Sequence, residues 1–197
     1  EAASLLKITA RARLKLAVCA DSEIVMFRAE IGGEEHFAVL IGTGADSDTP
    51  LVRLHSQCIT GDILGSLKCD CGDQLQAAMR LMADTGGGVL VYLAQEGRDI
   101  GLLNKMRAYA LQDNGLDTVD ANHALGFDTD ERLFLPAARI LQALNITKIQ
   151  LITNNPDKIS QLEQHGINVT TRVPLALATN PHNQKYLQTK QARTGHI

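Results

Sequence analysis

Short apolar runs separated by polar segments fill the first third of this chain, and they limit what it can form. Residues 23–29, 36–41 and 51–55 each have the length and apolar character of a β-strand. Residues 43–50 between the last two runs read TGADSDTP, which is typical of a polar loop. We therefore expect a β-rich N-terminal part over residues 1–50.

Helical spacing follows this part of the chain. Leu75, Ala78, Met79 and Met82 recur at the i, i+3, i+4 and i+7 positions of one helix face, and glycines at 86–88 are expected to end that helix. Further helices are expected at 102–112 and 135–144, and strands at 89–93, 149–153 and 169–173.

A last helix is predicted from its end signals, with Asn155 as N-cap, Pro156 at the first position and Gly166 past the end. This order of elements predicts a mixed α/β (α+β) fold. We expect one domain over residues 1–197, of which 51–197 form the catalytic core.

Composition excludes several classes of protein. Apolar residues make up 45% of the 197 and charged residues 21%, which is the balance of a globular protein. A net charge of −3 gives no general attraction to nucleic acid or to an anionic membrane. No apolar run is long enough to span a bilayer, and no secretory signal is visible. The chain begins with Glu1 rather than Met, so further N-terminal residues are expected.

Three of the four cysteines form a C-x10-C-x-C cluster made of Cys58, Cys69 and Cys71. This uneven spacing favours a reducing cytoplasm over a disulfide framework. Three thiolates and one open position are typical of catalytic zinc, whose bound water ionises near neutral pH. Three unrelated buried thiols remain an alternative, and His55 as a fourth ligand would make the site structural. Cys19 is expected to be a core thiol.

Several motifs together resemble the GTP cyclohydrolase II family. They are RLHSQCITGDILGSLKCDCGDQL at 53–75, the run from QEGRDIG to DTDER at 95–132, TNNPDK at 153–158 and RVPL at 172–175. The resemblance covers about three-quarters of the chain. It implies a homodimeric enzyme that uses one Zn²⁺ per chain and Mg²⁺ with the GTP phosphates. Such an enzyme converts GTP into a diamino-phosphoribosylamino-pyrimidinone, formate and pyrophosphate, the first step of riboflavin biosynthesis.

The resemblance also implies roles for individual residues. Cys58, Cys69 and Cys71 would hold the zinc, and Tyr109 would lie beside the reacting ring to donate a hydrogen bond or relay a proton. Asp130 would be the proton acceptor, and Arg132 the nucleophile at the α-phosphate. Because arginine stays charged, Arg132 as a phosphate clamp is an equally open reading. Without the family, Tyr109 would be an ordinary half-buried tyrosine and D-E-R a solvated helix start.

Twelve residues are expected to contact GTP by the same resemblance. Glu96 would accept from the guanine N1–H and 2-amino groups, and Arg98 would bind phosphate. Gln57 stands where some relatives have glutamate, which removes one charge. The full set is Arg53, Leu54, His55, Ser56, Gln57, Gln74, Glu96, Gly97, Arg98, Thr118, Thr153 and Lys158.

Three alternatives stay in view. Some relatives open the ring and retain the formyl group, and others act in uracil breakdown; intact Tyr109, Asp130 and Arg132 argue against both. A non-enzymatic zinc module that binds nucleic acid is disfavoured by the acidic charge and by few aromatic residues. Many bacterial relatives carry a fused dihydroxybutanone-phosphate synthase domain, for which 197 residues leave no room, so that activity is not expected.

Overall fold

The computed structural model describes residues 6–29, 33–128, 130 and 132–175. Their contacts divide into two compact units. The first comprises Glu1–His55, Gln76–Ala94 and Leu133–Leu175, and the second comprises Ser56–Leu75, Gln95–Arg132 and Ala176–Ile197, the last of which lies outside the described residues. Each unit is assembled from separate stretches of the chain. The expectation of one domain over 1–197 stays a prediction.

One mixed sheet of seven strands organises the described residues of the first unit. The strands are β1 (Leu6–Arg13), β2 (Ser22–Ala29), β3 (His36–Gly42), β4 (Leu51–Ser56), β5 (Gly87–Leu93), β6 (Lys148–Ile152) and β7 (Asn168–Val173). Their order across the sheet is β1-β2-β3-β5-β4-β6-β7. The pairs β1–β2, β2–β3 and β3–β5 are antiparallel, whereas β4–β6 and β6–β7 are parallel. A mixed α/β fold with a β-rich N-terminal part is thereby confirmed.

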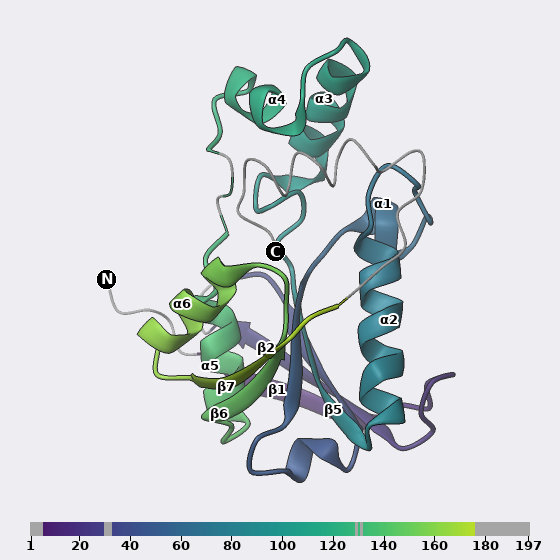
Figure 1. The fold of residues 1–197 in the computed structure, drawn as a ribbon, viewed down its shortest axis with the longest axis vertical. Coiled ribbons are helices and arrows are strands. Elements are labelled where there is room, and N and C mark those ends of the chain that lie inside the picture. Colours follow the sequence, from purple (N-terminus) through teal and green to yellow (C-terminus); the bar gives the residue numbers. More distant parts are fainter. Residues whose placement is uncertain (1–5, 30–32, 129, 131, 176–197) are drawn as a thin grey trace. The chain divides into compact units, whose positions relative to one another are not determined.

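Helices connect these strands and also build much of the second unit (Figure 1). They are α1 (Ile59–Asp62), α2 (Cys71–Asp84), α3 (Gly101–Asp113), α4 (Thr118–Ala124), α5 (Leu135–Ala143) and α6 (Pro156–Gln164), with a 3₁₀ turn η1 (Gly44–Asp46). Every strand and helix expected from the sequence is present, with bounds that differ by a few residues. Asn155 caps α6 by accepting from the Asp157 amide at 3.0 Å.

The structure corrects two expectations. Gly87 and Gly88 belong to β5 instead of ending the preceding helix. A Cβ on Gly88 would lie 2.4 Å from the Leu51 carbonyl oxygen, so the strand passes too close to its neighbour for a side chain. Cys19 is not a core thiol: it is half-buried between β1 and β2, and its Sγ donates to the Asp21 carbonyl at 3.2 Å.

Strand β1 and the short helices α1 and α4 were not anticipated. The side chains of β1 are almost all exposed, so the strand has no apolar alternation to reveal it. Helices α1 and α4 are too short to show a repeating apolar face.

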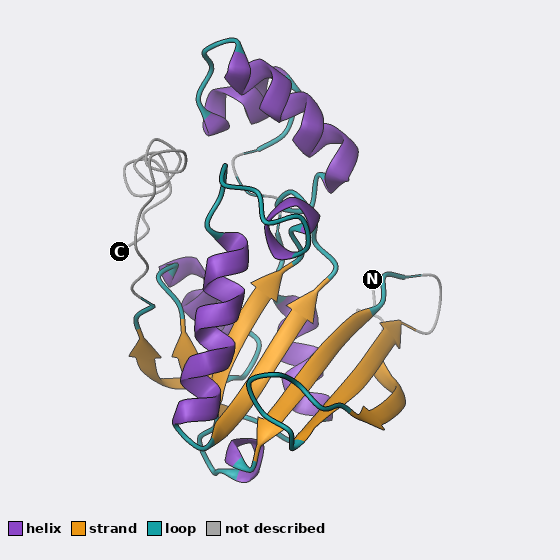
Figure 2. Cartoon of the chain, turned by 90° about the vertical axis from the view of Figure 1, so that its right-hand side faces the viewer, coloured by secondary structure: helices purple, strands orange, loops and turns teal. Residues whose placement is uncertain are grey.

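The core of the first unit lies between the sheet and two helices. Figures 1 and 2 show α5 and α6 on one face of the sheet and α2 on the other. Alternate residues Val89, Val91 and Leu93 of β5 are fully buried in the same cluster as residues of α5. No helix among the described residues is long and apolar enough to cross a membrane.

Truncating the core beneath this sheet is expected to destabilise it measurably. Leu151 in β6 has no exposed surface, so Leu151→Ala should lower the free energy of unfolding by about 2–5 kcal/mol. Leu64→Ala makes the same chemical change where 72% of the side chain is exposed, and should cost about 0.5 kcal/mol or less. Urea denaturation of both variants checks this, and equal losses would contradict the described core.

Candidate metal centre and catalytic loop

The three clustered cysteines converge in the second unit. Cys58 precedes α1, Cys69 lies just before α2, and Cys71 is the first residue of α2. Their Sγ atoms all lie within 4.8 Å of one another, and those of Cys58 and Cys69 are 3.7 Å apart. All three are free thiols. The fold therefore brings together ligand atoms that are up to thirteen positions apart in the sequence.

This donor set fits zinc. Tetrahedral Zn–S bonds of about 2.3 Å place two sulfur atoms about 3.8 Å apart, close to the separation of the Cys58 and Cys69 sulfurs. Among the described residues, the group able to hold a metal consists of the three cysteines, and His55 is not a member. The His55 ring instead stacks on Tyr92, with centroids 5.4 Å apart. Three ligands would leave one position of a tetrahedral ion open.

Two glycines make room for the thiols, and the sequence reading missed both. A Cβ on Gly61 would lie 2.9 Å from the Cys69 Sγ and 3.2 Å from the Cys58 Sγ. A Cβ on Gly72 would lie 2.3 Å from the Gly61 carbonyl oxygen. Their only signal in the sequence is their place within the cysteine motif. The cluster thus depends on backbone without side chains at two points.

The sulfur of Cys58 is held in an electropositive setting. Lys105 Nζ donates to it at 3.0 Å, and the Cys58 amide donates to Asp62 Oδ2 at 3.0 Å. Hydrogen bonds with Cys69 and Cys71, and then with Lys105, lower the pKa of the Cys58 thiol despite its burial. The pKa of Cys69 is raised, chiefly by its hydrogen bond with Cys58. Cys58 is therefore the first of these two thiols to ionise.

Glu96 and Lys105 form a buried ion pair beside the cluster. Glu96 Oε1 accepts from Lys105 Nζ at 2.8 Å and from the Gly97 amide at 2.9 Å, while Oε2 accepts from the Ile59 amide at 2.7 Å. Burial would lower the pKa of Lys105, but the hydrogen bonds to Glu96 and Cys58 outweigh it and raise the pKa. Lys105 was not anticipated from the sequence, and it occupies a buried position of α3.

These contacts bear on the expected role of Glu96. An ionised carboxylate accepts about four hydrogen bonds, and three N–H groups of the protein already point at this one. Accepting hydrogen bonds from both the N1–H and the 2-amino group of guanine would need two further acceptor sites on this carboxylate, and about one remains. The base-reading role stays a prediction.

Tyr109 lies on α3 in a cationic environment. Lys68 Nζ is 5.0 Å and Lys105 Nζ 5.8 Å from the centroid of its ring. Lys68 also forms an ion pair of 2.6 Å with Asp113 near the end of the same helix. Two ammonium groups within about 6 Å are attracted to the electron-rich face of the aromatic ring, and this attraction helps to position the phenol.

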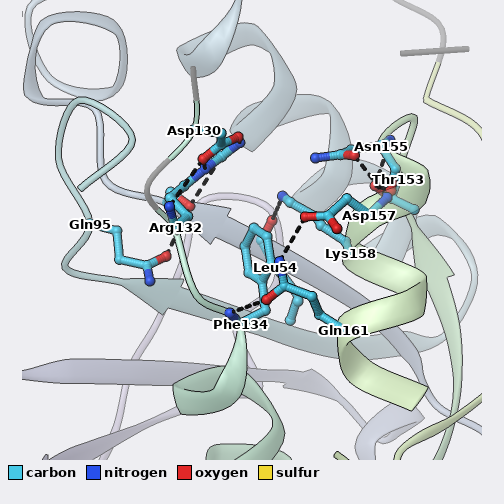
Figure 3. Close-up of polar contacts among 11 residues, drawn as sticks. Leu54, Gln95, Asp130, Arg132, Phe134, Thr153, Asn155, Asp157, Lys158 and Gln161 are labelled. Atoms are coloured by element: carbon cyan, nitrogen blue, oxygen red, sulfur yellow. Dashed lines mark hydrogen bonds and ion pairs between the residues drawn. The ribbon is translucent and has the colours of Figure 1, made fainter. Parts of the chain in front are cut away.

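Asp130 and Arg132 face each other as a fork (Figure 3). Arg132 Nε donates to Asp130 Oδ1 at 2.7 Å, Nη2 donates to Oδ2, and Nη1 reaches Ser56 Oγ at 3.4 Å. Burial would raise the pKa of Asp130, but the hydrogen bonds and charge of Arg132, with the charge of Arg98, hold it below its usual value. Both members of the pair are therefore charged at neutral pH.

The loop after β5 holds further residues expected to contact GTP. Gly97 adopts φ +64°, and Arg98 and Asp99 adopt φ 61° and 75°, a left-handed conformation that is costly for residues with a side chain. The Asp99 and Gly101 amides donate to the Glu96 carbonyl at 3.1 and 2.9 Å and close this turn. Such strained turns are typical of functional loops.

The other expected contacts in the second unit have simpler surroundings. Ser56 Oγ donates to Gln95 Oε1 at 3.4 Å, and Gln74 Nε2 donates to Asp70 Oδ2 at 2.5 Å. Thr118 is the first residue of α4, directly after the capping residue Asp117. Gln57 is half-buried between Ser56 and Cys58.

Five expected GTP contacts lie in the first unit, where they are buried. Arg53 Nη1 donates to the Ile152 carbonyl at 3.0 Å. Lys158 Nζ donates to the Leu54 carbonyl at 2.8 Å and lies 5.3 Å from the Phe134 ring centroid. Figure 3 shows Lys158 reaching Leu54, and Thr153 turned toward Asn155. The remaining two members are Leu54 itself and His55.

The described residues combine a mixed α/β fold, a three-thiol candidate metal site and a carboxylate–guanidinium pair, Asp130–Arg132. The chain belongs to the GTP cyclohydrolase II family, whose profile matches residues 7–174. The resemblance to this family is thereby confirmed, and the chain is a hydrolase of that family.

Curated relatives support this assignment. The GTP cyclohydrolase-2 of Azotobacter vinelandii is 57% identical over 87% of this chain and 82% of its own length. That of Azospirillum brasilense is 51% identical over 98% of this chain, which spans 50% of that relative's length. A solved two-domain 3,4-dihydroxy-2-butanone 4-phosphate synthase from A. baumannii matches with a TM-score of 0.46 and 17% identity, over 88% of this chain and 41% of its own. A TM-score below 0.5 does not establish a common fold.

A side chain at position 61 is expected to push the three thiols apart and so to weaken metal binding. Gly61→Ala should reduce the zinc that co-purifies with the protein well below one ion per chain, because the new methyl group would contact two of the sulfurs. Gly65→Ala is the matched control, since nothing lies within 4 Å of its added Cβ, although its φ of +64° adds some strain. Elemental analysis of the two folded variants makes the comparison. Full zinc content in Gly61→Ala would contradict the geometry of the cluster.

Proposed function

We propose that this chain catalyses the GTP cyclohydrolase II reaction, which opens the imidazole ring of GTP and releases formate and pyrophosphate at the start of riboflavin biosynthesis. The observation that carries the proposal is the convergence of Cys58, Cys69 and Cys71 in a member of this family. One Zn²⁺ per chain would be held by these thiolates, and Mg²⁺ would accompany the GTP phosphates. The active form would be a cytoplasmic homodimer.

Zinc held there would supply a Lewis acid and an ionised water for the additions at C8 that end in formate. The chain's own groups then orient the base and move protons. Tyr109, fixed beneath two ammonium groups, is proposed to donate a hydrogen bond or relay a proton beside the reacting ring.

Pyrophosphate release is proposed to depend on the Asp130–Arg132 fork. Arg132 holds the pKa of Asp130 low and so keeps its carboxylate ionised at neutral pH, which is the form able to accept a proton. Arg132 donates through Nε and Nη2 to the carboxylate, so its guanidinium is held as a cation. This supports a role in which Arg132 stabilises the charge that develops at the α-phosphate, rather than one as the attacking nucleophile.

The GTP contacts are proposed on the family resemblance. In the second unit they are Ser56, Gln57, Gln74, Glu96, Gly97, Arg98 and Thr118, and in the first unit Arg53, Leu54, His55, Thr153 and Lys158. The left-handed turn at Gly97 and Arg98 carries a half-buried guanidinium, a group that binds phosphate well. Gln57 would hydrogen-bond without adding a negative charge near those phosphates.

The test is to incubate the protein with GTP and to measure formate, pyrophosphate, GMP and the absorbance of the diaminopyrimidine separately. The proposal expects formate, pyrophosphate and the diaminopyrimidine together. Cys69→Ser should abolish formate while some pyrophosphate and GMP still form, because water addition at C8 needs the metal ligands and phosphoryl transfer does not. Arg132→Ala should stop both halves if the phosphate step comes first.

Each departure from this pattern has its own meaning. Ring opening without formate would identify the relative that retains the formyl group. Loss of pyrophosphate release in folded Cys69→Ser would show that both halves need the metal, and formate without pyrophosphate from Arg132→Ala would reverse the order of steps. Folding must be verified by circular dichroism first, since removal of a metal ligand can unfold its loop.

The pH dependence of turnover follows from the low pKa of Asp130. A carboxylate whose pKa lies below its usual value keeps its ion pair above about pH 4 and loses it as the pH falls further. Any acidic limb of kcat/KM above about pH 5 should therefore come from another group. Asp130→Asn should lower kcat/KM without changing the shape of its profile between about pH 5 and 9. A limb near pH 6 that vanishes in Asp130→Asn would contradict this assignment.

A further inference from the structure

One buried ammonium in the second unit contacts a candidate metal ligand. Lys105 is 9% exposed, and its Nζ lies 3.0 Å from Cys58 Sγ and 2.8 Å from Glu96 Oε1. Burying a lysine is costly unless its charge is paired. Both of these partners can be anionic, so the position of Lys105 is explained by the sulfur and the carboxylate that it joins.

Glu96 ties the same sulfur to the backbone around it. Its Oε2 accepts from the amide of Ile59, the residue after Cys58, at 2.7 Å, while its Oε1 accepts from Lys105 and from the Gly97 amide. The amide of Cys58 is separately held by Asp62 Oδ2 at 3.0 Å. Cys58 is thereby fixed at its sulfur, at its own amide and at the amide that follows.

We propose that Lys105, held in place by Glu96, is a positioning residue for the metal centre. The ammonium of Lys105 draws electron density from the Cys58 sulfur and so makes a metal bound by the three thiolates more electrophilic. The inference rests on the proposed function only in that the cysteine cluster binds a divalent metal.

The charges explain why such a group is needed. Three thiolates carry one negative charge more than a divalent cation neutralises, which strengthens their donation to the metal and weakens its action as a Lewis acid. An N–H···S hydrogen bond from an ammonium offsets that excess at one ligand, as groups that hydrogen-bond to ligating side chains commonly do. Among the described contacts, both carboxylate oxygens of Glu96 accept hydrogen bonds from nitrogen atoms, including the Lys105 ammonium.

The experiment uses Co²⁺ as a spectroscopic probe and a zinc-binding competition against a chromophoric chelator. Lys105→Met removes the ammonium but leaves Glu96 buried without its cation, and an unpaired buried charge destabilises the fold. The double variant Lys105→Met/Glu96→Gln is neutral at both positions and keeps an acceptor for the Ile59 or Gly97 amide. Arg107→Met is the matched control, because it removes a cation from an exposed position of the same helix.

The double variant, folded by circular dichroism, should bind zinc about 10–100-fold more weakly than the unaltered protein, because the Cys58 sulfur loses the hydrogen bond that positions it and this loss outweighs its stronger electron donation. Its sulfur-to-cobalt charge-transfer band should move to longer wavelength, because a sulfur without the N–H···S bond gives up its electrons more readily. Arg107→Met should match the unaltered protein in both readouts. A change in overall stability alone would not shift the band.

A folded double variant with unchanged band position and unchanged zinc affinity would overturn the inference while leaving the metal centre in place. Absence of any sulfur-to-cobalt band in the unaltered protein would instead remove the thiolate metal centre from the proposed function, and with it this role for Lys105. The two failures are therefore distinguished by the unaltered protein alone.

Discussion

Three sulfur atoms within 4.8 Å of one another set the main constraint on the second unit. Thiols at this separation cannot all ionise without a cation, because like charges so close repel strongly. An ammonium 3.0 Å from one sulfur offsets part of this repulsion. The absence of side chains at Gly61 and Gly72 separately leaves room for the three sulfurs to approach one another. The loop from β4 to α2 and the helix α3 are consequently linked through one small cluster.

The polar residues of the family motifs are engaged with the protein itself to an unexpected degree. In the second unit, Glu96 accepts from three N–H groups and Asp130 from the guanidinium of Arg132. In the first unit, Arg53 and Lys158 donate to main-chain carbonyls of β6 and β4. Such side chains are held in fixed rotamers before any ligand arrives, which is the condition for a preorganised site. A substitution at one of them is therefore expected to alter local structure as well as ligand contacts.

The element pattern was readable from the sequence because most elements bury one face. Strand β5 is a continuous apolar run, helix α2 carries apolar residues at helical spacing, and Asn155 with Pro156 marks the start of α6 through local hydrogen bonding. Strand β1 was not predicted because its side chains are almost all exposed and its position depends on pairing with β2. Gly87 and Gly88 were expected to end the preceding helix, because the close approach of Gly87 to Ile41 and of Gly88 to Leu51 arises only in the packed sheet.

The sequence by itself determined the family, the fold class and which three thiols form the candidate metal centre, because motif spacing and the apolar pattern are properties of the residue order. Tertiary structure alone decided that Lys105 contacts Cys58 and that both carboxylate oxygens of Glu96 accept hydrogen bonds from N–H groups of the protein. Cys58 and Lys105 are 47 positions apart, and nothing in the order of residues fixes a distance between them. Only the packing of α3 against the cysteine loop brings the ammonium to the sulfur, because burial forces each charge to find a partner.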